Sequence, residues 1–275
     1  MKNKRSAFER VASSPYIVWS AIFIIAPLLF VAYFAFTDRD GGFTLENMLS
    51  LSSYSHTFLM SLGFSLIATT VCFLIGYPLA YCMARMSERS RGIMMTMLML
   101  PMWISLLIRT YSLMALLDNG GIVSTFLTRL GFEKLTFIGT DAAVILGMIY
   151  DFLPYMVLPI YTTMTKLDKR YMEAAADLGC NNFQTLFRVI LPLSMPGVIS
   201  GLMMGFTLSL DDFVISHFVS SPDFKTLPLY IYNQTAHEVK FSMYALCALI
   251  VAIILAILLV VNFTGSVNGM KKNKI

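Results

Sequence analysis

The stretch Glu173–Gly179 reads Glu-Ala-Ala-Ala-Asp-Leu-Gly, and Pro192 follows thirteen residues after the glycine. These residues lie in a polar segment, 163–194, that separates two long apolar runs. Alanine and leucine favour a helix, and a glycine can take the left-handed conformation that ends one. The stretch therefore predicts a short helix, a glycine break and a second short helix. Together they would form a docking surface for another protein.

Capping residues mark the ends of both predicted helices. Asp168 can accept backbone N–H groups of a helix that starts at Lys169, and Asn181 or Asn182 can cap the second helix. The second helix carries apolar residues at helical spacing: Phe183, Leu186, Phe187 and Ile190. Pro192 is expected to redirect the backbone where the chain re-enters the bilayer.

The composition indicates a membrane protein. The chain is 57% hydrophobic and 13% charged, with a mean hydropathy of +0.72, whereas soluble domains carry about 25% charged residues. Crossing the hydrocarbon core takes about 20 residues of helix, and six runs are long enough. They lie near 16–36, 58–84, 92–117, 142–162, 195–218 and 243–264. The alternating pattern of a membrane β-barrel is absent from the sequence, so we expect an all-α, polytopic membrane protein with six transmembrane helices.

The basic residues predict the orientation of these helices. Fourteen of the 20 Lys and Arg residues fall in the two termini and in the loops after the second and fourth runs. Loops rich in Lys and Arg stay on the cytoplasmic side. Both termini and the 163–194 loop are therefore expected in the cytoplasm.

One membrane domain accounts for nearly the whole chain. We expect a cytoplasmic N-terminal segment at 1–15, the six-helix domain at 16–264 and a basic cytoplasmic tail at 265–275. The first apolar run is longer than the 7–15 residues typical of a cleaved signal peptide, so it is expected to remain as an anchor. Several glycines are expected to allow close helix packing: Gly63, Gly76, Gly147, Gly201 and Gly205.

Motifs for enzymatic chemistry are missing from the sequence. It contains no nucleotide-binding G-x-x-x-x-G-K-[ST], no H-E-x-x-H and no G-x-S-x-G. The four cysteines show no metal-ligand spacing. The net charge of +4 is explained by the cytoplasmic flanks and does not indicate nucleic acid. We therefore expect no catalytic site, no metal and no cofactor bound by this chain.

Three acidic residues fall inside predicted spans, and a carboxylate there costs about 2.5–3.5 kcal/mol on insertion scales. They are Asp151 in the fourth span and Asp211 and Asp212 in the fifth. One interpretation is structural: one of the two fifth-span acids pairs with Arg109 of the third span or caps a helix break, or the acids lie close enough to the outer surface to be in contact with water. The other is an acidic passage, which lowers the barrier for a cation.

Aromatic residues near these acids fit the passage interpretation, because ring faces attract ammonium groups by about 0.5–2 kcal/mol each. The same rings could equally be packing residues of a helical bundle. The candidate passage residues are Arg109, Tyr150, Asp151, Tyr155, Asp211, Asp212 and Phe213.

The polar loop also resembles a known element. Glu173-Ala174-Ala175 with Gly179, followed by Ile190-Leu191-Pro192, is similar to the EAA loop of permease subunits in bacterial binding-protein-dependent ABC importers. The resemblance implies the type I ABC importer permease fold, in which this loop is a coupling helix seated on the ATPase. The implied coupling residues are Glu173, Ala174, Ala175, Asp177, Gly179 and Pro192.

Further motifs resemble the spermidine/putrescine importer permeases. Leu107–Tyr111, Ile149–Tyr155 and Lys166–Asp168 are similar to one subunit type of that system, and Gly205–Ile215 to the other. Related permeases for iron, opines or amino-acid-like cations share much of this pattern. A secondary transporter and a membrane scaffold remain as alternatives from other classes.

The resemblance implies the partners as well. These are a second, paralogous permease, two ATP-binding cassette subunits that use ATP and Mg²⁺, and an extracytoplasmic substrate-binding protein in a bacterial cell membrane. The outer loops at 37–56 and 219–242 would meet the binding protein.

Overall fold

The computed structural model describes residues 7–38, 41–118, 120–131, 137–168, 170–221, 226–235 and 240–252. Within them every regular element is helical, apart from one antiparallel bridge between Thr37 and Phe43. The chain divides into two compact units, 1–55 with 233–275 and 56–232. The predicted tail at 265–275 and the first six residues lie outside the described part of the chain.

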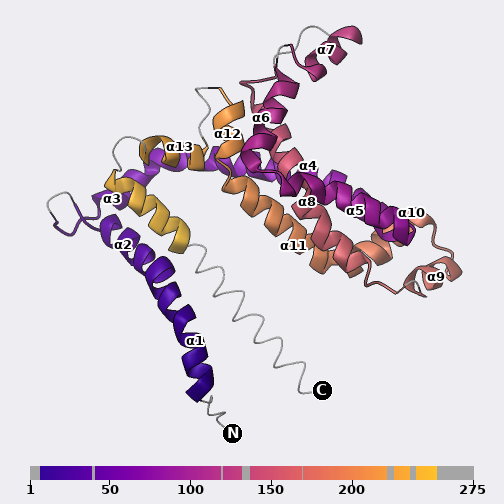
Figure 1. Cartoon of the computed structure of the whole chain (residues 1–275), viewed down its shortest axis with the longest axis horizontal. Helices are drawn as coiled ribbons and strands as arrows, with labels where there is room; N and C mark the ends of the chain where they lie inside the picture. Colours follow the sequence, from indigo (N-terminus) through magenta and orange to yellow (C-terminus); the bar gives the residue numbers. More distant parts are fainter. Residues whose placement is uncertain are drawn as a thin grey trace. The chain divides into compact units, whose positions relative to one another are not determined.

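In the first unit, three helical segments run on from one another through the predicted first span (Figure 1). They are α1 (Ala7–Ser20), the π-helical η1 (Ala21–Ile25) and α2 (Ala26–Ala35). The continuous stretch Ser14–Ala35 is long and apolar enough to cross a membrane, which confirms that prediction. The π-helical turn precedes Pro27, because a proline cannot donate the regular bond and its ring crowds the preceding turn.

The rest of this unit consists of α3 (Glu46–Leu49), the 3₁₀ turn η2 (Ser50–Tyr54) and an apolar helix, Phe241–Ala252. The ring of Phe34 lies 6.0 Å from Phe241 and 5.2 Å from Tyr244, so aromatic contacts join α2 to the last helix. The predicted sixth span, 243–264, is described only as far as Ala252.

The second unit contains the remaining helices. In chain order these are α4 (Ser55–Arg85), α5 (Glu88–Trp103), α6 (Leu106–Leu117), α7 (Ile122–Arg129), α8 (Asp141–Met164), α9 (Arg170–Asp177), α10 (Asn182–Thr185), η3 (Leu186–Ile190), α11 (Leu191–Leu210), α12 (Val214–Val219) and α13 (Leu227–Thr235). The second and fourth predicted spans are confirmed within three residues at each end by α4 and α8.

The core of this unit lies around α8, which packs along α11 (Figure 1). A Cβ added at Gly201 of α11 would lie 2.8 Å from the Met156 carbonyl oxygen of α8, so only glycine allows this approach. A Cβ added at Gly76 of α4 would likewise lie 3.2 Å from side-chain carbons of Met156 and Val157. Gly63, in contrast, borders open space, so the expectation of close packing there was wrong.

The third predicted span is not one straight helix. Helix α5 stops at Trp103, Ile104 is extended, and the following helix is bent by more than 40° from α5. Pro101 lies in the last turn of α5 and cannot donate a hydrogen bond to the preceding turn, which favours an end at this point.

The fifth predicted span, 195–218, was wrong at both ends. The helix runs without interruption from Asn182 to Leu210, then breaks at Asp211–Phe213 before α12. The break follows from Asp212, whose carboxylate accepts the backbone N–H groups of Ile215 at 3.3 Å and Ser216 at 3.2 Å. A side chain that captures these donors starts a new helix.

Among the described residues, four helices are long and apolar enough to cross a membrane, or five if the bent pair around Ile104 counts as one span. The chain is thus a multi-pass helical membrane protein.

We predict that Gly201→Ala destabilises the protein by about 1–3 kcal/mol, because the added methyl group forces α8 and α11 apart. The measurement is the thermal unfolding midpoint of the detergent-solubilised protein. Gly63→Ala is the matched control and should leave the midpoint unchanged or raise it, since alanine is the better helix former. An equal loss for both variants would contradict the packing argument.

Candidate functional site

The predicted docking loop folds as two short helices separated by a glycine turn. After α8 ends at Met164, Asp168 accepts the backbone N–H of Arg170 at 3.0 Å and α9 begins. Lys169, the predicted first residue of this helix, lies outside the described residues. The expected role of Asp168 as the residue that opens the helix is confirmed.

Gly179 closes α9 in the way that the sequence predicts. Its φ is +79°, in the left-handed region. The N–H of Gly179 donates to Ala176, at 2.9 Å, and the N–H of Cys180 donates to Ala175, at 3.0 Å, which is the paired pattern of a Schellman cap. A Cβ here would meet nothing within 4 Å, so the glycine is needed for its backbone conformation rather than for space.

The second helix of the loop begins with a complete capping box. Asn181, one of the two predicted caps, accepts the N–H of Gln184 at 2.7 Å, and the Gln184 side chain accepts the N–H of Asn181 at 3.0 Å. These reciprocal bonds fix the angle at which the chain leaves the glycine turn.

Pro192 does not redirect the backbone, contrary to expectation. It occupies the first turn of α11, and the helix continues through it from α10. The π-helical η3 immediately before it absorbs the lost hydrogen bond, with the N–H of Leu191 donating to Leu186. The loop is therefore joined rigidly to the membrane helix α11.

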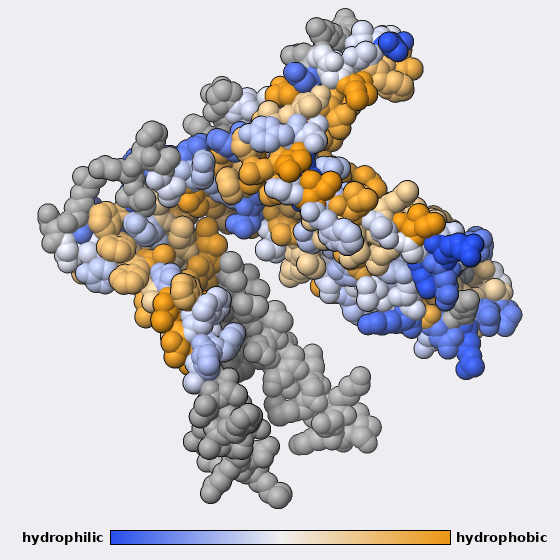
Figure 2. All heavy atoms as spheres, viewed as in Figure 1, coloured by the Kyte–Doolittle hydropathy of each residue, from blue (hydrophilic) through white to orange (hydrophobic). Residues whose placement is uncertain are grey.

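The surface of the loop combines acidic and apolar side chains. Hydrophilic residues cluster at the end of the second unit where α9 and α10 lie (Figure 2). Ala175 is buried, whereas Glu173, Ala174 and Asp177 are exposed. Leu178 is 85% exposed and Phe183 70% exposed.

The sequence did not indicate which apolar side chains of this loop are exposed. The helical spacing grouped Phe183 and Phe187 with Leu186 and Ile190 as one face. In the structure Ile190 is buried, but the two phenylalanine rings are exposed and lie 4.6 Å apart. We call Glu173, Asp177, Leu178, Phe183 and Phe187 the loop patch.

A second group of candidate residues surrounds a buried ion pair. The Nη1 of Arg109 on α6 lies 3.0 Å from Oδ1 of Asp151 on α8, and their side chains are only 8% and 2% exposed. Asp151 is thus the partner of Arg109, in place of either acid of the fifth span. The pair joins α6 to α8 in the interior of the unit.

Asp212 is also buried, at 6% exposure, and caps the first turn of α12. Its carboxylate additionally accepts the Ser216 hydroxyl at 3.3 Å. The structural interpretation of this acid, as the cap of a helix break, matches the observed contacts.

Asp211, in contrast, is exposed and begins a surface strip of aromatic residues. The ring of Phe213 stacks on Tyr232 at 5.1 Å, and His217 meets Tyr232 edge-on at 5.4 Å. Tyr150 is exposed as well, whereas Tyr155 packs against the core. Sequence reasoning missed His217 and Tyr232, which lie beside Phe213 only because the chain folds back after α12.

Comparison with known proteins identifies relatives across most of the chain. Residues 73–266 match the family described as binding-protein-dependent transport system inner membrane component. The spermidine/putrescine transport system permease protein PotB of Haemophilus influenzae is 38% identical over 214 residues, which cover 74% of this chain and 75% of that protein. The permease protein PotC of the corresponding Escherichia coli system is 31% identical over 224 residues, 82% of this chain and 78% of that protein.

Solved structures show the same fold. A bacterial ABC transporter involved in the import of the acidic polysaccharide alginate matches with a TM-score of 0.73 and 19% identity, over 94% of both chains. An alginate transporter in complex with its pentasaccharide-bound periplasmic protein matches with a TM-score of 0.70 and 18% identity, over 92% of this chain and 91% of that one.

We predict that Asp151→Asn lowers the free energy of unfolding by about 3–5 kcal/mol, because Arg109 is left as a buried charge without its partner. Arg109→Leu should cost a similar amount. The double variant Arg109→Leu/Asp151→Leu should lose much less than the sum of the two single losses. Denaturant unfolding of the three detergent-solubilised variants measures this coupling, and simple additivity would contradict a stabilising pair.

Proposed function

The chain belongs to the family of binding-protein-dependent transport system inner membrane components, and we propose that it is a permease subunit of an ABC importer for the polyamines spermidine and putrescine. The observation that supports this substrate assignment is the 38% identity to a permease of a spermidine/putrescine system over 74% of the chain. The fold alone does not select a substrate, since a transporter of an acidic polysaccharide shares it at 19% identity.

In this proposal the loop patch docks on an ATP-binding cassette subunit. Two exposed rings and an exposed leucine supply the apolar anchors, and Glu173 and Asp177 offer charges for basic residues of the partner. Ala174 is small and exposed and would permit close approach of the partner, while Ala175 is buried beneath this surface. Gly179 sets the turn, and Pro192 stays within the helix that carries movement of the loop into α11.

The passage for substrate is proposed to run along the exposed strip that contains Asp211 and Phe213. Tyr150, which is exposed and directly precedes Asp151 in the sequence, is proposed to line it as well. A carboxylate is expensive to expose to lipid, which favours water or a second permease at this face. A cation gains from the carboxylate and from the ring faces. Arg109, Asp151 and Asp212 shape this region from inside, and Tyr155 packs behind it.

The proposed machine has further subunits. A second, paralogous permease would complete the passage, an extracytoplasmic binding protein would deliver the substrate, and two ATPase subunits would use ATP and Mg²⁺. This chain would itself bind no nucleotide and no cofactor. Both termini and the loop patch are proposed to face the cytoplasm, in agreement with the distribution of Lys and Arg.

We predict that deleting this chain abolishes uptake of radiolabelled putrescine and spermidine by intact cells, and that the wild-type chain restores it. Asp211→Asn, expressed at the wild-type level, should lower uptake at least about tenfold, equivalent to 1.4 kcal/mol. Asp212→Asn should act differently, by lowering the amount of folded protein in the membrane. Unchanged uptake after deletion, in cells with no second polyamine system, would reject polyamines and leave the importer architecture standing.

We predict that Phe183→Ala/Phe187→Ala weakens binding of the ATPase subunits by about 2 kcal/mol, or roughly thirtyfold, because it removes two central apolar anchors. Co-purification of the ATPase with the tagged permease measures this loss. Phe43→Ala is the control, since it also removes an exposed ring but lies in the first unit. Normal ATPase recovery by the double variant would contradict docking through the loop patch.

A further inference from the structure

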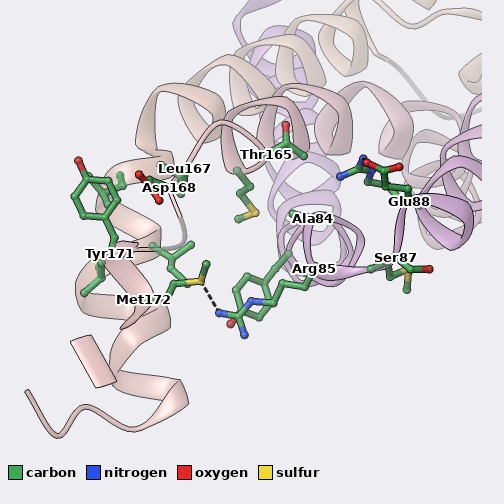
Figure 3. Close-up of a pocket in the computed structure, with 16 residues that line it drawn as sticks. Ala84, Arg85, Ser87, Glu88, Thr165, Leu167, Asp168, Tyr171 and Met172 are labelled. Atoms are coloured by element: carbon green, nitrogen blue, oxygen red, sulfur yellow. Dashed lines mark hydrogen bonds and ion pairs between the residues drawn. The ribbon is translucent and has the colours of Figure 1, made fainter. Parts of the chain in front are cut away.

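A cavity of about 450 Å³ lies behind the docking loop, inside the second unit. It is bounded by the end of α4, the start of α5, the end of α8, the first turns of α9, and η3 with α11 (Figure 3). Arg85 is the last residue of the long apolar helix α4, and Met164 the last of α8. The cavity therefore lies where membrane spans give way to the polar loop.

The wall of this cavity has an apolar part and a cationic part. Met164, Leu167, Ile190 and Leu193 supply hydrocarbon. Two arginines, Arg85 and Arg91, supply positive charge, with Ser87 between them in sequence. An occupant that matches both parts is itself amphipathic and carries an anionic group.

Two contacts hold the guanidinium of Arg85 in place, and neither of them neutralises its charge. Its guanidinium lies 4.2 Å from the ring centre of Tyr81, and its Nη2 lies 3.0 Å from the sulfur of Met172 on α9 (Figure 3). Both contacts are with uncharged groups. Within the described residues no carboxylate comes within ion-pair distance of Arg85.

Neither of the two carboxylates of the cavity wall pairs with Arg85. Asp168 caps α9 and its second oxygen lies 4.0 Å from Arg170. Glu88 approaches Arg91 only at 3.9 Å, and its side chain is almost fully exposed. The two arginines therefore keep donor capacity for a phosphate, which guanidinium groups bind through paired hydrogen bonds.

We propose that this cavity binds the phosphate headgroup of an anionic phospholipid from the cytoplasmic leaflet. The proposal rests on the membrane orientation given above, and it does not depend on the polyamine substrate. Basic pockets between helices on the cytoplasmic side suit such headgroups. The apolar wall favours a lipid over free inorganic phosphate, since it would accept the start of the acyl chains.

A bound headgroup would connect the α4–α5 corner to the docking loop. Arg85 already reaches Met172 of α9 across the cavity. A phosphate held by Arg85 and Arg91 would fill the space behind α9 and stiffen its position. Anionic lipid would thereby support the transfer of movement from the ATPase to the membrane helices.

The test uses the complete complex with its partner permease and ATPase subunits, reconstituted in nanodiscs of phosphatidylcholine with or without phosphatidylglycerol. Native mass spectrometry counts the phosphatidylglycerol molecules retained after release from the disc. Arg85→Gln/Arg91→Gln should lower this retention at least tenfold. Arg89→Gln is the matched control, because Arg89 is an exposed basic residue of the same helical turn that does not line the cavity.

A second variant, Ala84→Phe, fills the cavity without removing charge and should lower retention to a similar extent. ATPase activity of the wild-type complex should rise when phosphatidylglycerol is added, and the two cavity variants should lose this response. Displacement of the lipid by inorganic phosphate alone would identify a site for soluble phosphate and overturn the proposal. Equal retention by the cavity variants and Arg89→Gln, or retention of phosphatidylcholine as strongly as phosphatidylglycerol, would overturn it too.

Discussion

The structure depends on the constraint that backbone polar groups inside a membrane must be satisfied within the protein. This explains why the apolar runs are helices, and also how each irregularity is built. Pro27 and Pro192 both follow a π-helical turn, where a bond to the fifth preceding residue replaces the regular one. At the break after α11, the carboxylate of Asp212 takes over the first N–H groups of α12. At these three positions a local acceptor or a widened turn accommodates the irregular backbone.

The same constraint gives the docking loop its mechanical character. The glycine cap of α9 and the capping box of α10 fix a sharp, fully hydrogen-bonded turn. The helix then continues from Asn182 to Leu210, so a push on the loop patch moves α11 as a rod rather than bending a linker. Helix α11 packs directly on α8 through Gly201, and α8 holds α6 through the ion pair of Asp151 and Arg109. In the proposed function, movement of the loop would reach the interior through these packed contacts.

Local features were predictable from the sequence, and contacts between distant segments were not. The Schellman glycine, the Asn181 cap and the limits of α4 and α8 follow from neighbouring residues alone. The break at Asp211–Phe213 was only one of the open interpretations, because an apolar run outweighs two acids in a hydropathy window; in the structure Asp212 captures two N–H groups. Asp151 could not be chosen over its two competitors as the partner of Arg109, because that choice depends on how α6 sits against α8. The exposure of Phe183 and Phe187 likewise depends on which face of the helix the bundle covers.

The position of the charges also bears on specificity. Arg109 and Asp151 are buried and form an ion pair between α6 and α8, and the buried carboxylate of Asp212 accepts backbone N–H groups at the start of α12. Asp211 differs, since it is exposed at a helix end and is followed by stacked aromatic rings. The C-terminal end of α11 adds the negative pole of a helix dipole at the same place. A transporter of an acidic polysaccharide has the same fold at 19% identity, so the arrangement of helices does not decide the sign of the cargo. In the proposed passage, the exposed acid and the aromatic rings at the α11–α12 break would favour a cation.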